Sequence, residues 1–273
     1  MSGDARDGDD RDGDTKNGDL VTFAMRGDVA LLGLNRPAKR NAISDALLAA
    51  LEDRVAAAQR AARAMVVFGH GPCFSAGLDL GEHRARSAEE VFRHSRGWHR
   101  VFRAIRAGDV PAIAAIHGAC VGGGLELAAA CHIRVADETA FFALPEGTRG
   151  IFVGGGATVH VARLVGAARM ADMMLTGRAL DAAAAERAGL VTYVEPASGA
   201  AVRAEMLAAK VAAAAPLTVL GVLQALPRIQ DMAEEDGLFV ESLVAALAQT
   251  GPEAQARLSA FLEKRAPKAG PQE

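Results

Sequence analysis

Short apolar runs bounded by glycine or polar residues recur through the first half of the chain. Residues 20–26 and 29–35 form two such runs, and the glycine–aspartate pair between them is typical of a two-residue hairpin. Residues 65–68 and 113–116 have the length and composition of buried strands. The first half of the chain is therefore expected to supply the strands of a sheet.

Helical patterns alternate with these strands and dominate the second half. Ser44 before Asp45 is a favourable start for a helix over residues 46–62, and Ser87 with Glu90 forms a capping-box pattern for a helix that reaches Ile105. Further helices are expected over residues 181–188, 199–214, 217–226 and 253–264, with Pro216, Pro227 and Pro252 as boundaries. The alternation predicts an α/β protein with a helical C-terminal part.

The stretch over residues 113–136 is the one around which the chain is organised. It reads as a strand, a run of three glycines ending at Gly124, and a helix that carries Glu126 in its first turn. Unpaired N–H groups at such a helix start can stabilise negative charge on a substrate oxygen. Taken alone, a glycine run before a helix is more often a packing turn. A second strand, over residues 65–68, also ends in small residues and Gly77, where backbone N–H groups are accessible.

Composition limits the classes of function. The chain has 273 residues, half of them hydrophobic, and a net charge of −3 with no basic patch, which makes nucleic acid an unexpected partner. The three cysteines lack metal-ligand spacing and are expected to be reduced core thiols. No signal peptide or membrane-length apolar run is visible, so the cytoplasm is the expected location. Residues 1–19, rich in Asp and Gly, are expected to form a disordered tail.

Four motifs in a fixed order carry a family resemblance. They are LNRPAKRNA (residues 34–42), FSAGLDL (74–80), HGACVGGGLELA (117–128) and LPEGTRGIFVGGG (144–156). Shorter matches follow at LTGR (175–178), AGLV (188–191) and AFLEKR (260–265). Together these motifs resemble the crotonase superfamily, also called the enoyl-CoA hydratase/isomerase family, over roughly residues 20–265.

The resemblance implies a fold of repeated β-β-α units over residues 20–200, followed by a helical region over residues 201–273. In this family the helical region mediates trimers, which often pair into hexamers. The apolar segments at residues 170–175 and 238–247 fit such an interface, and they fit a core equally well. The chain itself shows no internal sequence repeat that would predict the repeated units.

The resemblance also implies a chemistry. Family members bind an acyl-coenzyme A thioester and stabilise its enolate with two backbone N–H groups, which by motif belong here to Leu78 and Gly123. Hydratases use two glutamates, matched here by Glu126 and Glu146, to hold the water that adds to the β-carbon of a trans-2-enoyl thioester. Glu146 then protonates the α-carbon. No metal or additional cofactor is implied, because coenzyme A is part of the substrate.

Binding of coenzyme A is assigned by the same resemblance. The phosphates are expected at Lys39 and Arg40, and the nucleotide and pantetheine path along Ala76, Asp79 and Leu80. Phe261 and Lys264 match a C-terminal pair that reaches the adenine and phosphate end, often from a neighbouring subunit.

Some positions depart from the family pattern. Phe152 and Val153 replace a common proline–glycine turn and are expected to reshape the acyl end of the pocket. His117 and His132 replace asparagine and aspartate, and a structural role is expected for both. His94 and His99, with Trp98, are expected to be packing or surface residues rather than catalytic bases.

Three functions remain open from the sequence. The pair of glutamates favours an enoyl-CoA hydratase. An enoyl-CoA isomerase generally needs only one carboxylate, and a non-catalytic acyl-CoA-binding protein would need neither.

Overall fold

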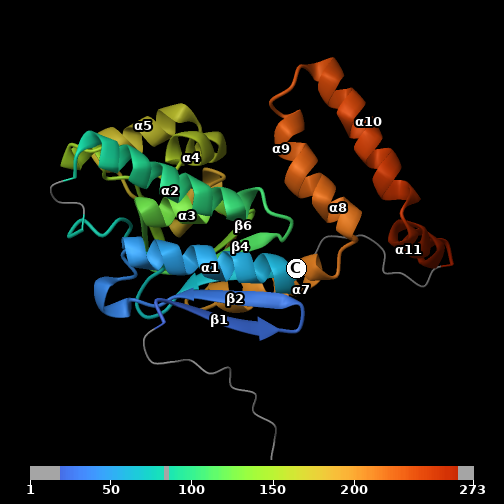
Figure 1. Cartoon of the computed structure of the whole chain (residues 1–273), viewed down its shortest axis with the longest axis horizontal. Coiled ribbons are helices and arrows are strands. Elements are labelled where there is room, and N and C mark those ends of the chain that lie inside the picture. The colour runs from blue at the N-terminus through green and yellow to red at the C-terminus, as the bar shows by residue number, and fades with distance from the viewer. Residues whose placement is uncertain (1–18, 83–85, 264–273) are drawn as a thin grey trace, which may run out of the picture.

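The computed structural model describes residues 19–82 and 86–263, and Figure 1 shows the arrangement of their helices and strands. The expected tail at residues 1–19 lies, apart from Asp19, outside the described residues. A layered α/β body holds both sheets, and an arm of helices extends from it at the C-terminal end of the described chain.

The larger sheet has six strands in the order β1-β2-β3-β4-β6-β9. Their bounds are β1 (Val21–Arg26), β2 (Val29–Leu34), β3 (Ala64–Gly69), β4 (Ala112–Ile116), β6 (Ile133–Asp137) and β9 (Tyr193–Glu195). β1 and β2 pair antiparallel as the predicted hairpin, and every other neighbouring pair is parallel. β2 and β4 are buried along their whole length, which explains their continuous apolar sequences, because helices cover both faces of the sheet.

Helices α1 (Asp45–Ala61), α2 (Ala88–Arg106) and α3 (Gly123–Ala130) lie over one face of this sheet (Figure 1). The Ser44 side chain caps α1 by accepting the Leu47 N–H, and Ser87 and Glu90 form the predicted capping box of α2. The leucines of α1, with Trp98 and Phe102 of α2, join one large core with this face. The predicted starts of both helices are confirmed.

A smaller sheet of three very short strands lies beside the first. It consists of β5 (Ala119–Val121), β7 (Phe141–Ala143) and β8 (Leu180–Asp181), with β5 and β7 parallel and β7 and β8 antiparallel. The chain order β1-β2-α1, β4-β5-α3 and β6-β7-α4 gives the repeated β-β-α units that the family resemblance implies. The remaining short connecting helices of the body are η1 (Pro37–Lys39), η2 (Gly147–Arg149), α4 (Ala157–Val165), α5 (Ala167–Thr176) and α6 (Ala182–Arg187).

The opposite face of the larger sheet is covered by α7 (Ala200–Ala212). Four alanines at a spacing of four residues, beginning with Ala200 and ending with Ala212, are buried against β3, β4 and β6. Their small side chains allow the helix to lie close to the sheet. The domain boundary expected at residue 200 therefore falls at the start of a helix that belongs to the core packing, and the boundary itself stays a prediction.

The arm begins at Pro216, which occupies the first turn of α8 (Pro216–Leu220). A π-helical turn, η3 (Gly221–Ala225), leads directly into α9 (Leu226–Ile229), and α10 (Glu234–Thr250) and α11 (Pro252–Leu262) follow. The sequence-based helix end before Pro227 is wrong. The Leu226 N–H instead bonds to the Gly221 carbonyl, and this wider turn lets the helix continue through proline, which has no N–H to donate.

Within the described residues, no single helix is both long and apolar enough to cross a membrane. α7 and the stretch Pro216–Ile229 reach that length and composition only as a pair bent by 116°. Cys73, Cys120 and Cys131 are all buried and unpaired, as expected for core thiols.

Candidate active site

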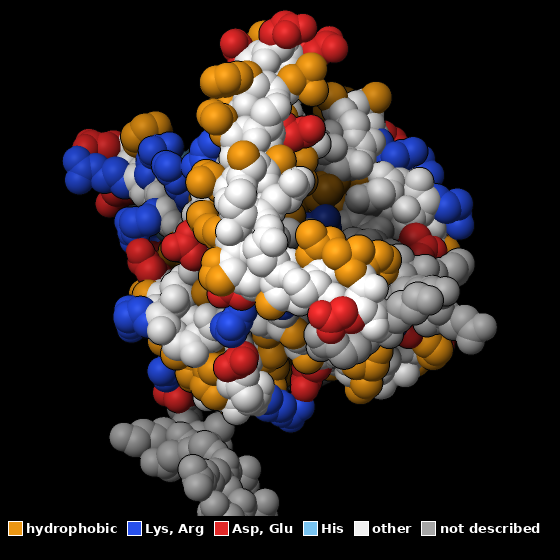
Figure 2. All heavy atoms as spheres, turned by 90° about the vertical axis from the view of Figure 1, so that its right-hand side faces the viewer, with side chains coloured by type: hydrophobic (Ala, Val, Ile, Leu, Met, Phe, Trp, Pro, Cys, Tyr) orange, Lys and Arg blue, Asp and Glu red, His pale blue; other side chains and the backbone are white. Residues whose placement is uncertain are grey.

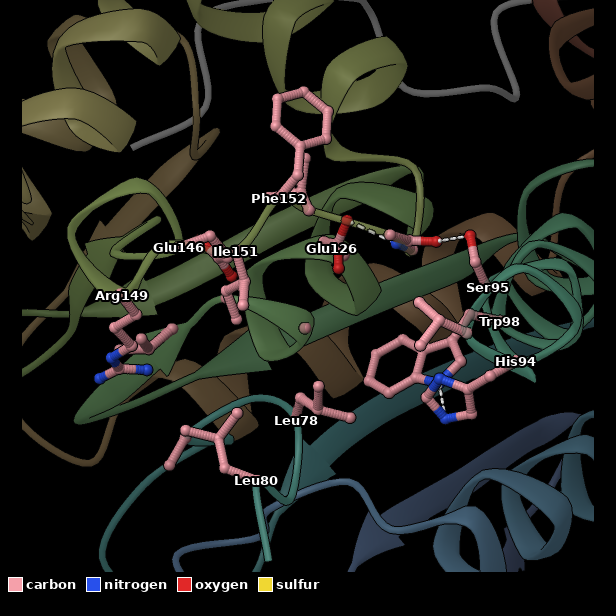
Figure 3. A pocket seen from close by; sticks show the side chains of 18 of the residues that line it. Leu78, Leu80, His94, Ser95, Trp98, Glu126, Glu146, Arg149, Ile151 and Phe152 are labelled. Atoms are coloured by element: carbon pink, nitrogen blue, oxygen red, sulfur yellow. Dashed lines mark hydrogen bonds between the residues drawn. The ribbon is translucent and has the colours of Figure 1, made fainter. Parts of the chain in front are cut away.

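A largely apolar cavity of about 480 Å³ opens between α2, the end of β5, and the segment after β7 (Figure 3). It is lined by Ala76, Leu78, Leu80, Val91, Phe92, His94, Ser95, Trp98, Val121, Gly122, Gly123, Glu126, Glu146, Arg149, Ile151, Phe152, Val153, Gly154 and Gly155. The cavity thus collects Leu78, Gly123 and both predicted glutamates from three separate parts of the chain, since Gly123 and Glu126 both belong to α3.

The Leu78 N–H faces away from its neighbouring strand segment. The Ile43 N–H donates to the Gly77 carbonyl, and the Asp79 N–H donates to the Ile43 carbonyl. Since successive groups in an extended segment alternate in direction, these two bonds leave the intervening Leu78 N–H on the other side. Gly77 makes this turn possible with a φ of +91°, and a Cβ at Gly77 would stand 2.5 Å from the Val121 carbonyl oxygen.

Gly123 brings a second N–H close to the first. It is the first residue of α3, where backbone N–H groups have no partner inside the helix. A Cβ built on Gly123 would lie 3.3 Å from the Leu78 nitrogen, and one on Gly77 would lie 3.1 Å from the Gly123 nitrogen. Two amide donors at the start of a helix therefore share one corner of the cavity, which suits an oxygen that gains negative charge.

Glu126 is a buried carboxylate whose orientation is fixed by backbone donors. Its Oε1 accepts hydrogen bonds from the N–H of Gly155, at 2.8 Å, and of Ala157, at 3.0 Å. The pKa of Glu126 is raised to about 7, chiefly by burial and in smaller part by the nearby charge of Glu146, against the lowering effect of these backbone donors. Glu126 can therefore exchange a proton near neutral pH.

Glu146 faces the same cavity from the residue that precedes η2. Its Oε2 is buried and has no hydrogen-bond partner among the described residues, while Oε1 lies 2.5 Å from where a Cβ on Gly122 would stand. Burial raises the pKa of this carboxyl group, and the Arg149 charge acts against the shift. An unpartnered carboxyl oxygen of raised pKa is suited to donate a proton to a bound molecule.

Comparisons of the sequence and of the fold with known proteins point to one family. A family profile described as enoyl-CoA hydratase/isomerase matches residues 25–271. The 2,3-dehydroadipyl-CoA hydratase of Escherichia coli K12 is 37% identical over 241 residues, which cover 88% of this chain and 94% of that protein. A solved structure from Rhodopseudomonas palustris, provisionally named an enoyl-CoA hydratase, matches with a TM-score of 0.87 and 51% identity over 90% of this chain and 95% of its own.

The chain belongs to the enoyl-CoA hydratase/isomerase, or crotonase, family. An enoyl-CoA hydratase structure from Mycobacterium smegmatis matches with a TM-score of 0.86 and 31% identity, over 91% of this chain and 98% of that one. The crotonase fold expected from the motifs is thereby confirmed.

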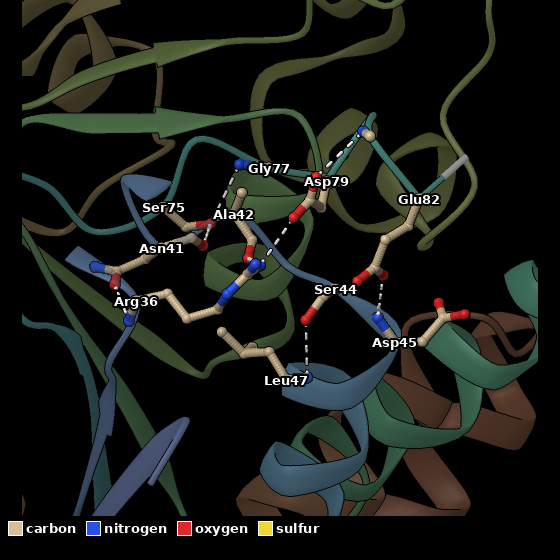
Figure 4. Close-up of polar contacts among 11 residues, drawn as sticks. Arg36, Asn41, Ala42, Ser44, Asp45, Leu47, Ser75, Gly77, Asp79 and Glu82 are labelled. Atoms are coloured by element: carbon tan, nitrogen blue, oxygen red, sulfur yellow. Dashed lines mark hydrogen bonds and ion pairs between the residues drawn. The ribbon is translucent and has the colours of Figure 1, made fainter. Parts of the chain in front are cut away.

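The residues expected to bind coenzyme A are only partly gathered at the crotonase cavity. Ala76 and Leu80 line it. Asp79 pairs with Arg36 at 3.0 Å (Figure 4), and this pairing, together with the more distant Lys39, lowers the pKa of Asp79. Lys39 ends η1 and Arg40 follows it in a left-handed conformation, outside the residues that line the cavity.

Phe261, the described member of the C-terminal pair, lies apart from the cavity of its own chain. Phe261 stands on α11, is 54% exposed, and does not line the cavity. Lys264 lies outside the described residues. The assignments of all these residues to coenzyme A stay predictions.

Several cavity residues were not assigned to the site from the sequence. Val91, Phe92, His94, Ser95 and Trp98 enter it because one face of α2 forms a wall. His94 also has an acidic neighbour that its own helix does not provide, since its Nε2 lies 2.9 Å from Asp45 Oδ1 on α1. Spacing along α2 cannot reveal a contact that two helices make only when packed.

The other unusual histidines serve the backbone. His132 Nδ1 accepts the Ala112 N–H, its Nε2 lies 3.0 Å from the Arg106 carbonyl oxygen, and burial lowers its pKa to about 4. His117 Nε2 lies 2.9 Å from the Gly71 carbonyl oxygen. Both have structural contacts, as expected. Among the described residues, no group of acidic, histidine or cysteine side chains could hold a metal ion.

Proposed function

We propose that this protein is an enoyl-CoA hydratase that adds water to a trans-2-enoyl-CoA thioester. The observation that carries the proposal is the meeting of two buried carboxyl groups, Glu126 and Glu146, with the paired amides of Leu78 and Gly123 in one cavity. The names of the relatives support the same reaction. An isomerase has less use for the second carboxyl group.

The proposed reaction places the thioester carbonyl oxygen between the amides of Leu78 and Gly123. A water held between the two glutamates gives one proton to the Glu126 carboxylate, and its oxygen bonds to the β-carbon. The electron pair of the double bond moves toward the carbonyl oxygen and forms an enolate, which the two N–H donors stabilise. Glu146 then gives its proton to the α-carbon and completes a 3-hydroxyacyl thioester. The raised pKa of Glu146 suits this donor role.

Loss of the absorbance of the conjugated thioester in crotonyl-CoA tests the proposal. The wild type is expected to consume it, while Glu126→Gln and Glu146→Gln, each tested alone, lose at least about 10²-fold in kcat. Calorimetry with butyryl-CoA, a saturated analogue, should show that both variants still bind thioester. Near-normal turnover in either variant would reject the two-glutamate mechanism. Thioester binding without any turnover by the wild type would favour the binding-protein alternative.

A cationic side chain in the cavity points to a second candidate for the acyl group of the substrate. Arg149 lines the cavity beside Glu146 and Ile151 (Figure 3), and its guanidinium makes no ion pair within the part of the chain that the structure describes. The relative from Escherichia coli is named for a thioester whose acyl chain ends in a carboxylate. We infer that Arg149 favours such an anionic acyl end over a methyl end.

Two six-carbon substrates separate these acyl groups. The wild type should show a higher kcat/KM for the trans-2-enoyl thioester with a terminal carboxylate than for trans-2-hexenoyl-CoA. Arg149→Met should lower the first value by about 10-fold and leave the second nearly unchanged. An equal loss on both substrates would instead place the Arg149 charge at the phosphates of coenzyme A, which the two substrates share.

The arm is proposed as the surface through which copies of this chain form trimers or hexamers. Figure 2 shows hydrophobic side chains along it, which include Leu220, Leu226, Leu238, Phe239, Leu243, Leu247 and Leu262, all at least 43% exposed. So much exposed apolar surface is typical of an interface. Light scattering should give a mass near three or six chains for the wild type, and Leu243→Glu with Leu247→Glu should reduce it. The cytoplasm stays the predicted location.

A further inference from the structure

Ser95 on α2 is connected to Glu126 on α3 through one peptide group that lies between them (Figure 3). The Ser95 hydroxyl donates a hydrogen bond of 2.6 Å to the Gly154 carbonyl oxygen. The Gly155 N–H, which belongs to the same peptide group, donates the 2.8 Å bond to Glu126 Oε1. The hydroxyl and the carboxylate therefore stand at the two ends of a single hydrogen-bonded chain.

Such a chain has two physical effects on the carboxylate. A hydrogen bond accepted by a peptide carbonyl polarises the peptide group and makes its N–H a stronger donor. A stronger donor to a carboxylate favours the ionised form. The same bond also holds the segment around Gly154 and Gly155 against α2, and this segment has no side chains at these two positions with which to anchor itself.

The carboxylate keeps other contacts when Ser95 is altered. The Ala157 N–H still donates to Glu126 Oε1, at 3.0 Å. The titratable or charged groups around this part of the cavity are Glu146, Arg149 and His94, with His160 on α4 beside Gly156. All of them are common to the wild type and to Ser95 variants. A change at Ser95 should therefore shift the titration of Glu126 rather than abolish its binding to the backbone.

We propose that Ser95 is a positioning residue that orients the Glu126 carboxylate and favours its ionised form through the peptide group between Gly154 and Gly155. The inference rests on the proposed function for the catalytic importance of Glu126, but the hydrogen-bonded chain itself does not depend on that function. Its first test therefore uses the titration of the carboxyl group, without substrate.

Carbon-13 NMR of protein labelled at the glutamate carboxyl carbons gives that titration, with the Glu126 signal assigned by its absence in Glu126→Gln. Ser95→Ala should raise the titration midpoint of Glu126 by about 0.3 pH units or more. The isosteric pair Ser95→Thr and Ser95→Val separates the hydroxyl from the bulk of the side chain, since only the valine variant should show the shift. This pair also decides the matter if Ser95→Ala folds poorly.

Ser87→Ala is the matched control because it removes another serine hydroxyl from α2, at its N-cap, away from the cavity lining. It should lower the stability of the protein and leave the midpoint of Glu126 unchanged. An unchanged midpoint in Ser95→Ala and Ser95→Val, or an equal shift in Ser87→Ala, would overturn the inference.

The pH dependence of kcat/KM for hydration is the functional test of the inference. The acidic limb, on which Glu126 must be ionised to accept a proton from water, should move to higher pH in Ser95→Ala and Ser95→Val, and stay in place in Ser95→Thr. If the wild type hydrates no thioester but the NMR midpoint depends on Ser95 as stated, the proposed function fails and the inference stands. If the wild type hydrates a thioester but the position of the acidic limb does not depend on Ser95, the proposed function stands and the inference fails.

Discussion

The indole ring of Trp98 lies directly against Gly123, so that a Cβ on this glycine would stand 2.5 Å from the indole Cζ3 atom. Trp98 is buried on α2, and Gly123 carries one of the two amides assigned to the oxyanion hole. The wall of the cavity and the amide donor are thus in contact with no room for a methyl group between them. Either the ring or the start of α3 has to move when a side chain is added there.

Gly123→Ala is therefore expected to lower kcat for hydration by about 10²-fold or more, because displacement of α3 misplaces the N–H donor. Gly97→Ala, on α2 next to Trp98, is the matched control, since a Cβ there meets no atom within 4 Å. It should leave kcat unchanged and stabilise the helix by about 0.5–1 kcal/mol. Trp98→Leu combined with Gly123→Ala should recover part of the lost activity; a double variant no better than Gly123→Ala alone would show that the indole contact is not the cause.

Glu126 predicts how stability depends on pH. Its pKa rises from 4.5 to about 7 on folding, so the native state binds more protons than the unfolded state within that window, and the free energy of unfolding falls as the pH rises. Glu126→Gln removes this effect. The stability of the variant relative to the wild type should therefore grow between pH 4.5 and pH 7, on the order of 3 kcal/mol in total, and change little above.

Urea unfolding at a series of pH values measures the difference. Glu235→Gln, an exposed change of the same kind on α10, is the control. A difference between Glu126→Gln and the wild type that is independent of pH would contradict the burial of an ionisable group at this position.

The buried imidazole of His132 predicts that stability changes with pH in the opposite direction. Its pKa falls from 6.5 to about 4 in the native state, so the unfolded state binds more protons between these values, and stability is lost as the pH falls from 6.5 toward 4. His132→Gln should reduce this loss, although it should also weaken the bonds to Ala112 and Arg106 at neutral pH. Denaturant midpoints at pH 7 and pH 5 test both statements, and equal pH sensitivity in variant and wild type would reject the first.

Lys39 tests the predicted phosphate contact. Lys39→Met should raise KM for an acyl-CoA substrate by about 10-fold with little change in kcat, because the charge binds a part of the substrate that does not react. The effect should weaken as salt increases. Arg60→Met, in the last turn of α1, is the control for loss of one exposed cation. An unchanged KM for Lys39→Met would remove this residue from the coenzyme A site.

The parts of the fold that could be predicted are those whose causes are local. The capping serines Ser44 and Ser87, the hairpin before Asn35 and the buried strands all follow from hydrogen bonds or periodicity within a few residues. The strands β5, β7 and β8 have two or three residues each, too few to produce a pattern. The helix continues past Pro227 because of a π-helical turn, and no local sequence pattern predicted that turn.

The residues of the candidate site also divide into those that could be predicted from the sequence and those that could not. Glu126, Glu146 and the glycine turns stood in recognisable motifs, so they could be named from the sequence. The contacts of His94 with Asp45 and of Ser95 with Gly154 join residues separated by 49 and 59 positions, and they exist only after α2 has packed against its neighbours. The cavity wall that Phe92 and Trp98 form on α2 results from the same packing.

The short pairing between β5 and β7 sets the relative positions of Gly123 and Glu146, which both take part in the proposed chemistry. Val121 pairs with Ala143, and the Gly122 N–H bonds to the Ala143 carbonyl at 2.9 Å, so Gly123 and Glu146 each follow closely on a matched pair of residues. One residue inserted after either strand would displace one of them by about 3.3 Å, which exceeds the tolerance of a hydrogen bond. The number of residues in these two strands is therefore fixed by the site as well as by the sheet.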